Sequence, residues 1–227
     1  MKNKLTKRNT FYIHKYSGIP LFGTLYFGIV DKGSSMIELK PLTGCNMNCM
    51  FCSVDEGISS KRFNDYLVEK EYLVEETKKL LDYKKENIDI YINPHGEPLL
   101  YPEITELCKD LSKLRYVDSI TLITAATILT KPIIDEFAKT KKTKLNVSLH
   151  AIDEKKAKEL FGTKVYNIKK ILEMLRYASK KLEIIIAPVL LPGYNEAEIP
   201  KIIDFAKEIK ARILPQKYLT NKTGRNP

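Results

Sequence analysis

Three cysteines lie close together within the first quarter of the chain. Cys45, Cys49 and Cys52 form a C-x3-C-x2-C pattern that directly follows the apolar stretch 36–44. A closed structural zinc site takes four protein ligands, whereas an iron–sulfur cluster can be held by thiolates at several irons while another iron stays open. The spacing therefore indicates a metal cluster with one open position, where chemistry could occur.

The same cysteines have two structural interpretations. A zinc ion could be bound if Cys108, His95 or His14 completed the set, and free cysteines are also among the residues most often buried. A disulfide framework is less suitable, because residues 45–52 span too short a segment to stabilise a chain that can build its own core. Cys108 lies in the stretch 101–114, whose apolar residues recur at three- and four-residue steps, so we expect it in a helix core and not at a metal.

The triplet, with Phe51 immediately before its last cysteine, resembles the signature of the radical S-adenosylmethionine (radical SAM) enzymes. In that family three cysteines hold a [4Fe-4S] cluster, and the methionine part of S-adenosylmethionine (SAM) chelates the fourth iron. The resemblance implies that the reduced cluster passes one electron to SAM, the carbon–sulfur bond breaks, and a 5'-deoxyadenosyl radical abstracts a hydrogen atom from the substrate. The protein orients cofactor and substrate and excludes water and oxygen.

The length and composition fit one globular domain. The chain has 227 residues, of which 44% are hydrophobic, an ordinary value for a domain that buries a core. Its longest apolar run, residues 18–30, is interrupted by glycines and is shorter than the ~20 residues of a membrane-spanning helix. Residues 1–18 are charged but are not followed by the apolar segment or cleavage site of a signal peptide. We therefore expect a cytoplasmic protein with no membrane contact, whose thiols stay reduced.

The net charge is strongly positive. There are 38 Lys and Arg residues against 28 Asp and Glu residues, a formal charge of +10, with local excess at 2–8, 139–144 and 222–225. Such a balance favours polyanions such as RNA. A Lys- and Glu-rich surface without tryptophan would equally suit a cytoplasmic protein adapted to heat.

From residue 36 onward, short β-rich runs alternate with longer amphipathic runs, the order expected of βα units around a parallel sheet. The expected strands are 36–42, 88–94, 119–125, 144–151, 182–190 and 211–218. The expected helices are 66–85, 102–115, 131–140, 153–161 with 167–180, and 197–210. Six strands are two too few for a closed eight-fold barrel but fit a partial (β/α)6 barrel, which the radical SAM resemblance also implies.

The residues before this α/β core are expected to add a β-hairpin, because Asp31-Lys32-Gly33 lies between two apolar runs. We therefore divide the chain into an N-terminal extension, residues 1–35, and a radical SAM core, residues 36–227. No sixth helix follows the last expected strand, so we expect the last helix and any C-terminal domain to be missing from the chain.

The second expected strand runs into a motif that resembles a SAM-binding loop. Reactive groups in parallel βα folds collect at the carboxyl ends of the strands, and this strand ends in N-P-H-G-E-P, residues 93–98. Gly96, Glu97 and Pro98 resemble the GGEP motif of radical SAM enzymes, which implies that the loop holds the amino group of SAM. His95 replaces the first glycine of the motif. Its imidazole either carries a proton to or from the substrate or simply bonds within its own loop.

The fourth expected strand carries a polar face. Asn146, Ser148 and His150 alternate along it and therefore point to one side. By resemblance, Ser148 and then Asn146 would bind the ribose hydroxyls and carboxylate of SAM, and His150 would face the substrate. The catalytic candidates are thus His95 and His150. A solvated edge face is the alternative interpretation of this pattern.

Two further strand ends resemble the family less closely. After the fifth expected strand, Val189 and Leu190 would supply the apolar contact to the adenine of SAM. The third expected strand ends in T-A-A-T, residues 124–127, where many relatives carry T-N-G. The polar contacts at that strand end are therefore expected to differ.

The expected substrate follows from the charge and from a looser resemblance. Residues 18–33, 52–57 and 222–227 resemble archaeal radical SAM proteins that continue into a TRAM domain, a small RNA-binding barrel. We expect a radical SAM enzyme that acts on a large substrate, RNA before protein, with an electron-donor protein and a separately encoded C-terminal domain as partners. Two alternatives stay open: a radical SAM enzyme that modifies or activates a protein or peptide, and a non-catalytic zinc-binding module.

Overall fold

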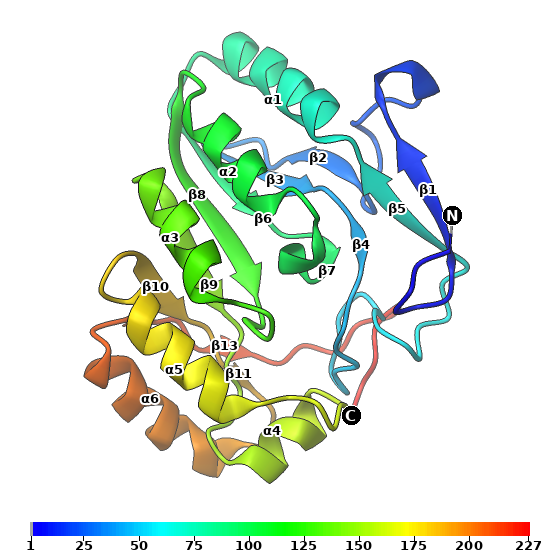
Figure 1. Ribbon diagram of the computed structural model, residues 1–227. Coiled ribbons are helices and arrows are strands. Elements are labelled where there is room, and N and C mark those ends of the chain that lie inside the picture. The colour runs from blue at the N-terminus through cyan, green and yellow to red at the C-terminus, as the bar shows by residue number, and fades with distance from the viewer. Residues whose placement is uncertain (1) are drawn as a thin grey trace.

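A seven-stranded sheet forms the centre of the molecule, and helices follow it along one face (Figure 1). The structure is a computed structural model in which residues 2–227 are described. The strand order across the sheet is β12-β10-β9-β8-β6-β3-β2, with β2 antiparallel to β3 and the other neighbours parallel. The strands of this sheet are β2 (Gly28–Asp31), β3 (Met36–Lys40), β6 (Ile88–Ile92), β8 (Val117–Thr124), β9 (Thr143–Val147), β10 (Glu183–Ile186) and β12 (Arg212–Ile213).

Three parallel strand pairs lie outside this sheet in the described part of the chain. They are β1 (Asn9–Ile13) with β5 (Asn64–Val68), β4 (Thr43–Gly44) with β7 (His95–Gly96), and β11 (Val189–Leu190) with β13 (Gln216–Lys217). The helices are α1 (Lys70–Lys84), α2 (Ile104–Ser112), α3 (Lys131–Lys139), α4 (Glu154–Leu160), α5 (Ile168–Ala178) and α6 (Ile199–Glu208).

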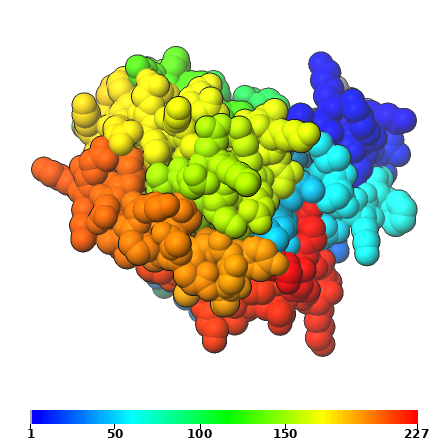
Figure 2. Space-filling model, turned by 90° about the horizontal axis from the view of Figure 1, so that it is seen from below, coloured from blue at the N-terminus to red at the C-terminus, as the bar shows by residue number. Residues whose placement is uncertain are grey.

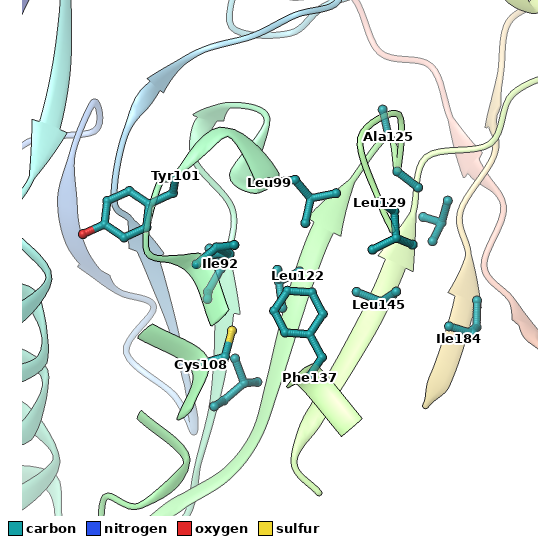
Figure 3. Packing of buried hydrophobic residues seen from close by; sticks show 14 of the residues in the cluster. Ile92, Leu99, Tyr101, Cys108, Leu122, Ala125, Leu129, Phe137, Leu145 and Ile184 are labelled. Atoms are coloured by element: carbon teal, nitrogen blue, oxygen red, sulfur yellow. The ribbon is translucent and has the colours of Figure 1, made fainter. Parts of the chain in front are cut away.

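The core lies between the sheet and the helices. Side chains alternate along a strand, and in β6 those of Ile88, Ile90 and Ile92 lie on one face and are fully buried. Figure 3 shows side chains of neighbouring strands beside Cys108 of α2 and Phe137 of α3. Cys108 is fully buried in this layer, which confirms its predicted place in a helix core.

The six parallel strands predicted after residue 35 are all present. The strand predicted at 144–151 is shorter than predicted, because β9 already ends at Val147. The runs predicted at 182–190 and 211–218 are each divided into two short strands. Pro188 interrupts the first run and Pro215 interrupts the second. Proline has no N–H to donate to a ladder, so pairing stops at these positions and resumes beyond them.

The predicted hairpin is also present. Strands β2 and β3 pair antiparallel, and the amide of Gly33 donates to Oδ1 of Asp31 over 2.9 Å within the turn. Because β2 lies at an edge of the central sheet, this part of the predicted extension 1–35 adds a strand to the sheet. The division at residue 35 remains a prediction.

The predicted helix 66–85 is wrong at its start. Residues 64–68 form β5, which pairs in register with β1, so that Phe11 lies opposite Tyr66, and α1 begins only at Lys70. Arg8 also forms a 2.8 Å ion pair with Asp65 of β5. Residues 64–68 are a strand because they pair with β1, more than fifty residues earlier in the chain. Local periodicity does not report such pairing.

The helices are all of modest length. None of those described in residues 2–227 combines the length and hydrophobicity needed to cross a membrane.

Replacing Phe137 by Ala should lower the free energy of unfolding by about 3–5 kcal/mol, because the ring is fully buried between α3 and the sheet and its loss leaves a cavity. Urea unfolding of the purified protein measures the change. Val165→Ala is the control, since Val165 is 79% exposed and should change stability little. An equal effect of the two substitutions would contradict the described core.

Candidate active site

One cavity of about 510 Å³ lies at the carboxyl ends of the parallel strands. The loops that follow β3, β6, β8, β9, β10 and β12 all contribute to its wall. This arrangement is the one expected of βα folds, in which ligands bind beyond the carboxyl edge of the sheet. The predicted site residues that line the cavity are Cys45, Cys49, Phe51, Cys52, Gly96, Glu97, Asn146, Ser148 and His150.

A short ladder joins the start of the cysteine loop (residues 45–59) to the G-E-P loop. Strand β4 pairs with β7, so that Gly44 lies opposite Gly96, and the amide of Glu97 donates to the carbonyl of Gly44 over 3.1 Å. Gly96 has φ +154°, and a Cβ there would collide with the Gly44 carbonyl. Only glycine permits this approach of the two backbones, which places Glu97 beside Cys45 in one cavity wall.

Glu97 is buried and held by three donors. Its Oε1 accepts from the amide of Leu99 at 3.1 Å and from the hydroxyl of Thr124, and its Oε2 accepts from the amide of Ala125 at 2.9 Å. Burial raises the pKa of Glu97, and these hydrogen bonds partly oppose the shift. A carboxylate has about four acceptor positions, so the side chain can still accept a hydrogen bond from a group in the cavity.

The three thiols of the triplet face the same cavity. The amide of Met47 donates to Sγ of Cys45 at 3.4 Å, and the amide of Glu56 donates to Sγ of Cys52 at 3.3 Å. Burial raises the pKa of Cys49 to about 12, and it raises that of Cys45 as well. Thiolates at these positions therefore need a bound cation to be stable. Across residues 2–227, no three His, Cys, Asp or Glu side chains are gathered closely enough to hold one metal ion.

The polar face of the fourth parallel strand also lines the cavity. Asn146, Ser148 and His150 all reach the wall, as predicted. Only Asn146 lies on β9, however, and Ser148 and His150 follow in the segment after the strand ends at Val147. Oδ1 of Asn146 is buried and has no hydrogen-bond donor within residues 2–227. A buried acceptor of this kind is costly unless a donor reaches it, so this atom is suited to a hydroxyl or ammonium group of a ligand.

His150 is fixed at the base of this wall. Its Nδ1 accepts from the amide of Val189 at 3.1 Å, and its ring lies edge-on to Phe51, with ring centres 4.9 Å apart, and stacks on Phe161. Burial lowers the pKa of His150 to about 3. The ring is therefore neutral at neutral pH and holds the aromatic residue of the cysteine motif in place.

Three predicted site residues do not line the cavity. His95 lies on the outer side of the G-E-P loop, where it contacts Nη2 of Arg62 at 3.2 Å and meets the ring of Tyr26 edge-on. Burial lowers the pKa of His95 to about 4. Pro98 begins the buried turn after Glu97. Leu190 is 37% exposed, and its neighbour Val189 reaches the cavity instead, because side chains alternate along β11.

Two residues that contribute to the site were not predicted from the sequence. Thr124 lies in the T-A-A-T stretch and bonds the carboxylate of Glu97; its position at a strand end was the available signal. Glu56 is buried in the cavity wall and forms ion pairs with Arg8 at 2.8 Å and with Arg62 at 3.0 Å. Burial raises the pKa of Glu56, and the two arginines oppose the shift. No local pattern connects Arg8 with the cysteine loop.

A family model described as the radical SAM superfamily matches residues 39–206. The chain belongs to the radical SAM superfamily. Membership implies a [4Fe-4S] cluster and SAM as cofactors, which favours the radical SAM interpretation over a zinc-binding module.

Several curated relatives are longer than this chain. It is similar to uncharacterized protein MJ0103 of Methanocaldococcus jannaschii, at 39% identity over 230 residues, and to GTP 3',8-cyclase of Clostridium botulinum, at 27% identity over 170 residues. The alignments cover 99% and 72% of this chain but 52% and 50% of the two relatives. The chain thus spans about half the length of the curated relatives it matches.

Solved structures share the fold. Streptococcus suis SuiB bound to S-adenosylmethionine matches with a TM-score of 0.62 and 21% identity, over 82% of this chain and 41% of SuiB. A mutant of spore photoproduct lyase matches with a TM-score of 0.64 and 12% identity, over 88% of this chain and 61% of the lyase. These similarities support the α/β fold with a mostly parallel sheet. The comparisons identify no substrate and support neither a TRAM domain nor RNA as a substrate.

The residues at the cavity fit the cofactors of the radical SAM superfamily. A [4Fe-4S] cluster takes one thiolate at each of several irons, and three thiols surround this one cavity. The free acceptor of Asn146 and the carboxylate of Glu97 supply partners for the hydroxyl and ammonium groups of SAM.

The pH dependence of stability should report the burial of His150. Between pH ~3 and ~6.5 the unfolded chain binds a proton at His150 that the folded chain does not, so stability falls as the pH falls below ~6.5, by about 1.4 kcal/mol per pH unit at most. Urea unfolding at about pH 7.5 and 5.5 should show a loss that is about 1 kcal/mol larger for the native chain than for His150→Gln. His95 is present in both proteins, so its contribution to the pH dependence of stability cancels in the comparison. The same loss in both would contradict the described burial.

Proposed function

We propose that this radical SAM enzyme binds its cluster and SAM in the cavity at the carboxyl edge of the sheet. The observation that carries the proposal is that the three thiols, the carboxylate of Glu97, and Asn146 and Ser148 at the end of β9 line a single cavity. Cys45, Cys49 and Cys52 would each bind an iron and leave the fourth iron open to SAM. We also infer that the parallel sheet with its helices is the partial (β/α)6 barrel of the family.

Residues of three strand ends would hold SAM. Glu97 would accept from the ammonium group through its free acceptor position, while Gly96 and Pro98 shape the loop that carries it. Asn146 Oδ1, which lacks a donor in the described chain, would accept from a ribose hydroxyl, while the hydroxyl of Ser148 would donate to the carboxylate of SAM. The apolar wall beside the adenine would come from Val189 and Ala187.

The aromatic residue of the motif completes this wall. Phe51 is held edge-on by His150, so both rings would limit access of water to the reacting atoms. The bound cofactors supply the chemistry: one electron from an external reductant, an electron-donor protein in the cell, splits SAM into methionine and a 5'-deoxyadenosyl radical that takes a hydrogen atom from the substrate. The roles of His95 and His150 toward the substrate remain predictions.

Anaerobic reconstitution should give a protein that forms 5'-deoxyadenosine from SAM under reducing conditions. Cys49→Ala should abolish the product, because two cysteines cannot hold the cluster with one open iron. Cys108→Ala is the matched control: this thiol is buried in α2, away from the cavity lining, and its loss should leave product formation unchanged. Iron and sulfide are measured in each sample. Absence of product from a chain with a complete cluster would contradict the proposal.

We further propose that the substrate is RNA, bound as a single strand beside the site. Phe11 and Tyr26 are 52% and 49% exposed, and both stack on Tyr66, with ring centres 6.1 Å and 6.5 Å away. The guanidinium of Arg62 lies 4.6 Å from the ring of Tyr26. Exposed stacked rings beside basic groups are suited to unpaired bases, which stack on them, and to phosphates.

This aromatic surface (Phe11, Tyr26 and Tyr66) is close to the cavity wall. Tyr26 contacts His95, the neighbour of the cavity residue Gly96, and Arg62 pairs with the cavity residue Glu56. Two lysines that follow these strands are ion-paired, Lys15 with Glu75 and Lys70 with Asp110. Four others near β1 and β5 have no carboxylate within ion-pair distance among residues 2–227, which leaves their charge available for phosphates: Lys2, Lys4, Lys7 and Lys61.

A fluorescently labelled single-stranded RNA should bind with an affinity that falls steeply between about 50 and 200 mM salt, since phosphate contacts release counterions. Phe11→Ala should weaken binding about 5- to 100-fold at fixed salt, because one base loses its stacking partner. Tyr83→Ala is the control, since Tyr83 is an exposed aromatic residue on α1. An affinity that is insensitive to salt, or turnover of a polypeptide without RNA, would contradict RNA as the substrate.

A further inference from the structure

The residues after β12 cross the open side of the cavity and return to the cysteine loop. We call residues 216–227 the closing segment. It begins as β13, which pairs with β11, and Gln216, Lys217, Tyr218, Leu219 and Asn221 line the cavity. Figure 1 shows this segment, in red, running from β13 toward β4, and Figure 2 shows its red atoms beside the light-blue region of the cysteine loop.

The backbone of the closing segment touches the backbone of the cysteine motif. The amide of Arg225 donates to the carbonyl of Cys52 over 2.8 Å. At Gly224 a Cβ would collide with the carbonyls of Cys52 and Ser53. A larger residue at 224 would push the segment away from the loop, so glycine is required for this approach.

The side chain of Arg225 bonds both arms of the cysteine loop. Nη1 donates to Oδ1 of Asn48 at 2.6 Å and to Oγ of Ser59 at 2.7 Å, while Nη2 donates to the carbonyl of Glu56. Nε lies 3.7 Å from Oδ1 of Asp55. These partners stand on either side of Cys49 and Cys52, so one guanidinium connects the beginning of the loop to its end.

The geometry of these contacts requires an arginine. Three acceptors that lie in different directions are reached at once by the planar, five-donor guanidinium, whereas a lysine ammonium is a single point with three donors. Asn48 depends on the same arrangement, because its Oδ1 also accepts from the amide and hydroxyl of Ser59, at 3.2 Å and 2.6 Å. Removing Arg225 would leave Asn48 and Ser59 bonded to each other but without the guanidinium that joins both of them to the carbonyl of Glu56.

We propose that Arg225 is a positioning residue that fastens the closing segment across the cavity and fixes the cysteine loop in the conformation that presents Cys49 and Cys52. The inference rests on one part of the proposed function, namely that the cysteine loop binds the cluster. Its role is local: the partners of Arg225 all belong to residues 48–59. Loss of the side chain should therefore loosen the loop without unfolding the sheet.

Hydrogen exchange of the full chain, purified without oxygen, tests this directly. Arg225→Gln should raise the exchange rate of peptides that cover residues 48–59 by about tenfold or more, because several hydrogen bonds of a charged group are lost. Arg225→Lys should behave the same way, since charge without the planar fork cannot bridge the acceptors. Gly224→Val, which keeps the arginine but displaces its backbone, should give the same rise. Unchanged exchange of this loop in these variants would overturn the inference.

Arg176→Gln is the matched control. Arg176 forms a two-point ion pair with Glu208 between α5 and α6, at 2.5 Å and 3.1 Å, and does not contact the cysteine loop. Its loss should leave the exchange of residues 48–59 at the native rate. An equal rise in this variant would overturn the inference, because the effect would then be a general loosening of the fold.

A second measurement separates loop positioning from general stability. In reconstituted protein, Arg225→Gln should release iron to a chelator about tenfold faster than the native chain, while the midpoint of thermal unfolding stays close to the native one. Equal release rates would overturn the proposal. Exchange rates require neither SAM nor turnover, so a native chain that forms no 5'-deoxyadenosine would contradict the proposed function and leave the test of Arg225 intact.

Discussion

The approach of two backbones at Gly44 and Gly96 is the constraint on which the site depends. The ladder between β4 and β7 joins the residue before Cys45 to the residue before Glu97. Neither the cysteine loop nor the G-E-P loop is paired with the central sheet, because β4 and β7 pair only with each other. Because the two loops are joined, the thiols and the buried carboxylate face one cavity, and the remaining strand ends only have to complete its wall.

Two buried carboxylates at this cavity are stabilised in different ways. Glu97 is held by neutral donors, whereas Glu56, on the other side of the cysteine loop, is neutralised by Arg8 and Arg62. Burial raises the pKa of Cys45 and of Cys49, which favours the neutral thiol at these two positions when no cation is bound. The cavity is therefore prepared for a positively charged group that converts thiols to thiolates, and buried charges without such a partner are costly.

The sequence predicted what depends on neighbours along the chain. The six parallel strands and the shared face of Asn146 and His150 follow from local periodicity, and the family follows from the spacing of the cysteines and the G-E-P motif. The sequence did not predict the features that depend on contacts between residues far apart in the chain. Residues 64–68 became a strand because β1 lies beside them. Arg225 was noted as part of a basic stretch and of the resemblance at 222–227. Its bond to Asn48 was not predicted, because the two residues lie 177 positions apart in the chain.

The central requirement is that one iron of the cluster has no protein ligand and is free for SAM. Mössbauer spectra of reconstituted protein, recorded before and after SAM is added, measure this most directly. We expect one iron of the [4Fe-4S] cluster to change its isomer shift and quadrupole splitting when SAM binds, while the three cysteine-bound irons keep theirs. Spectra that are identical with and without SAM would contradict the described site.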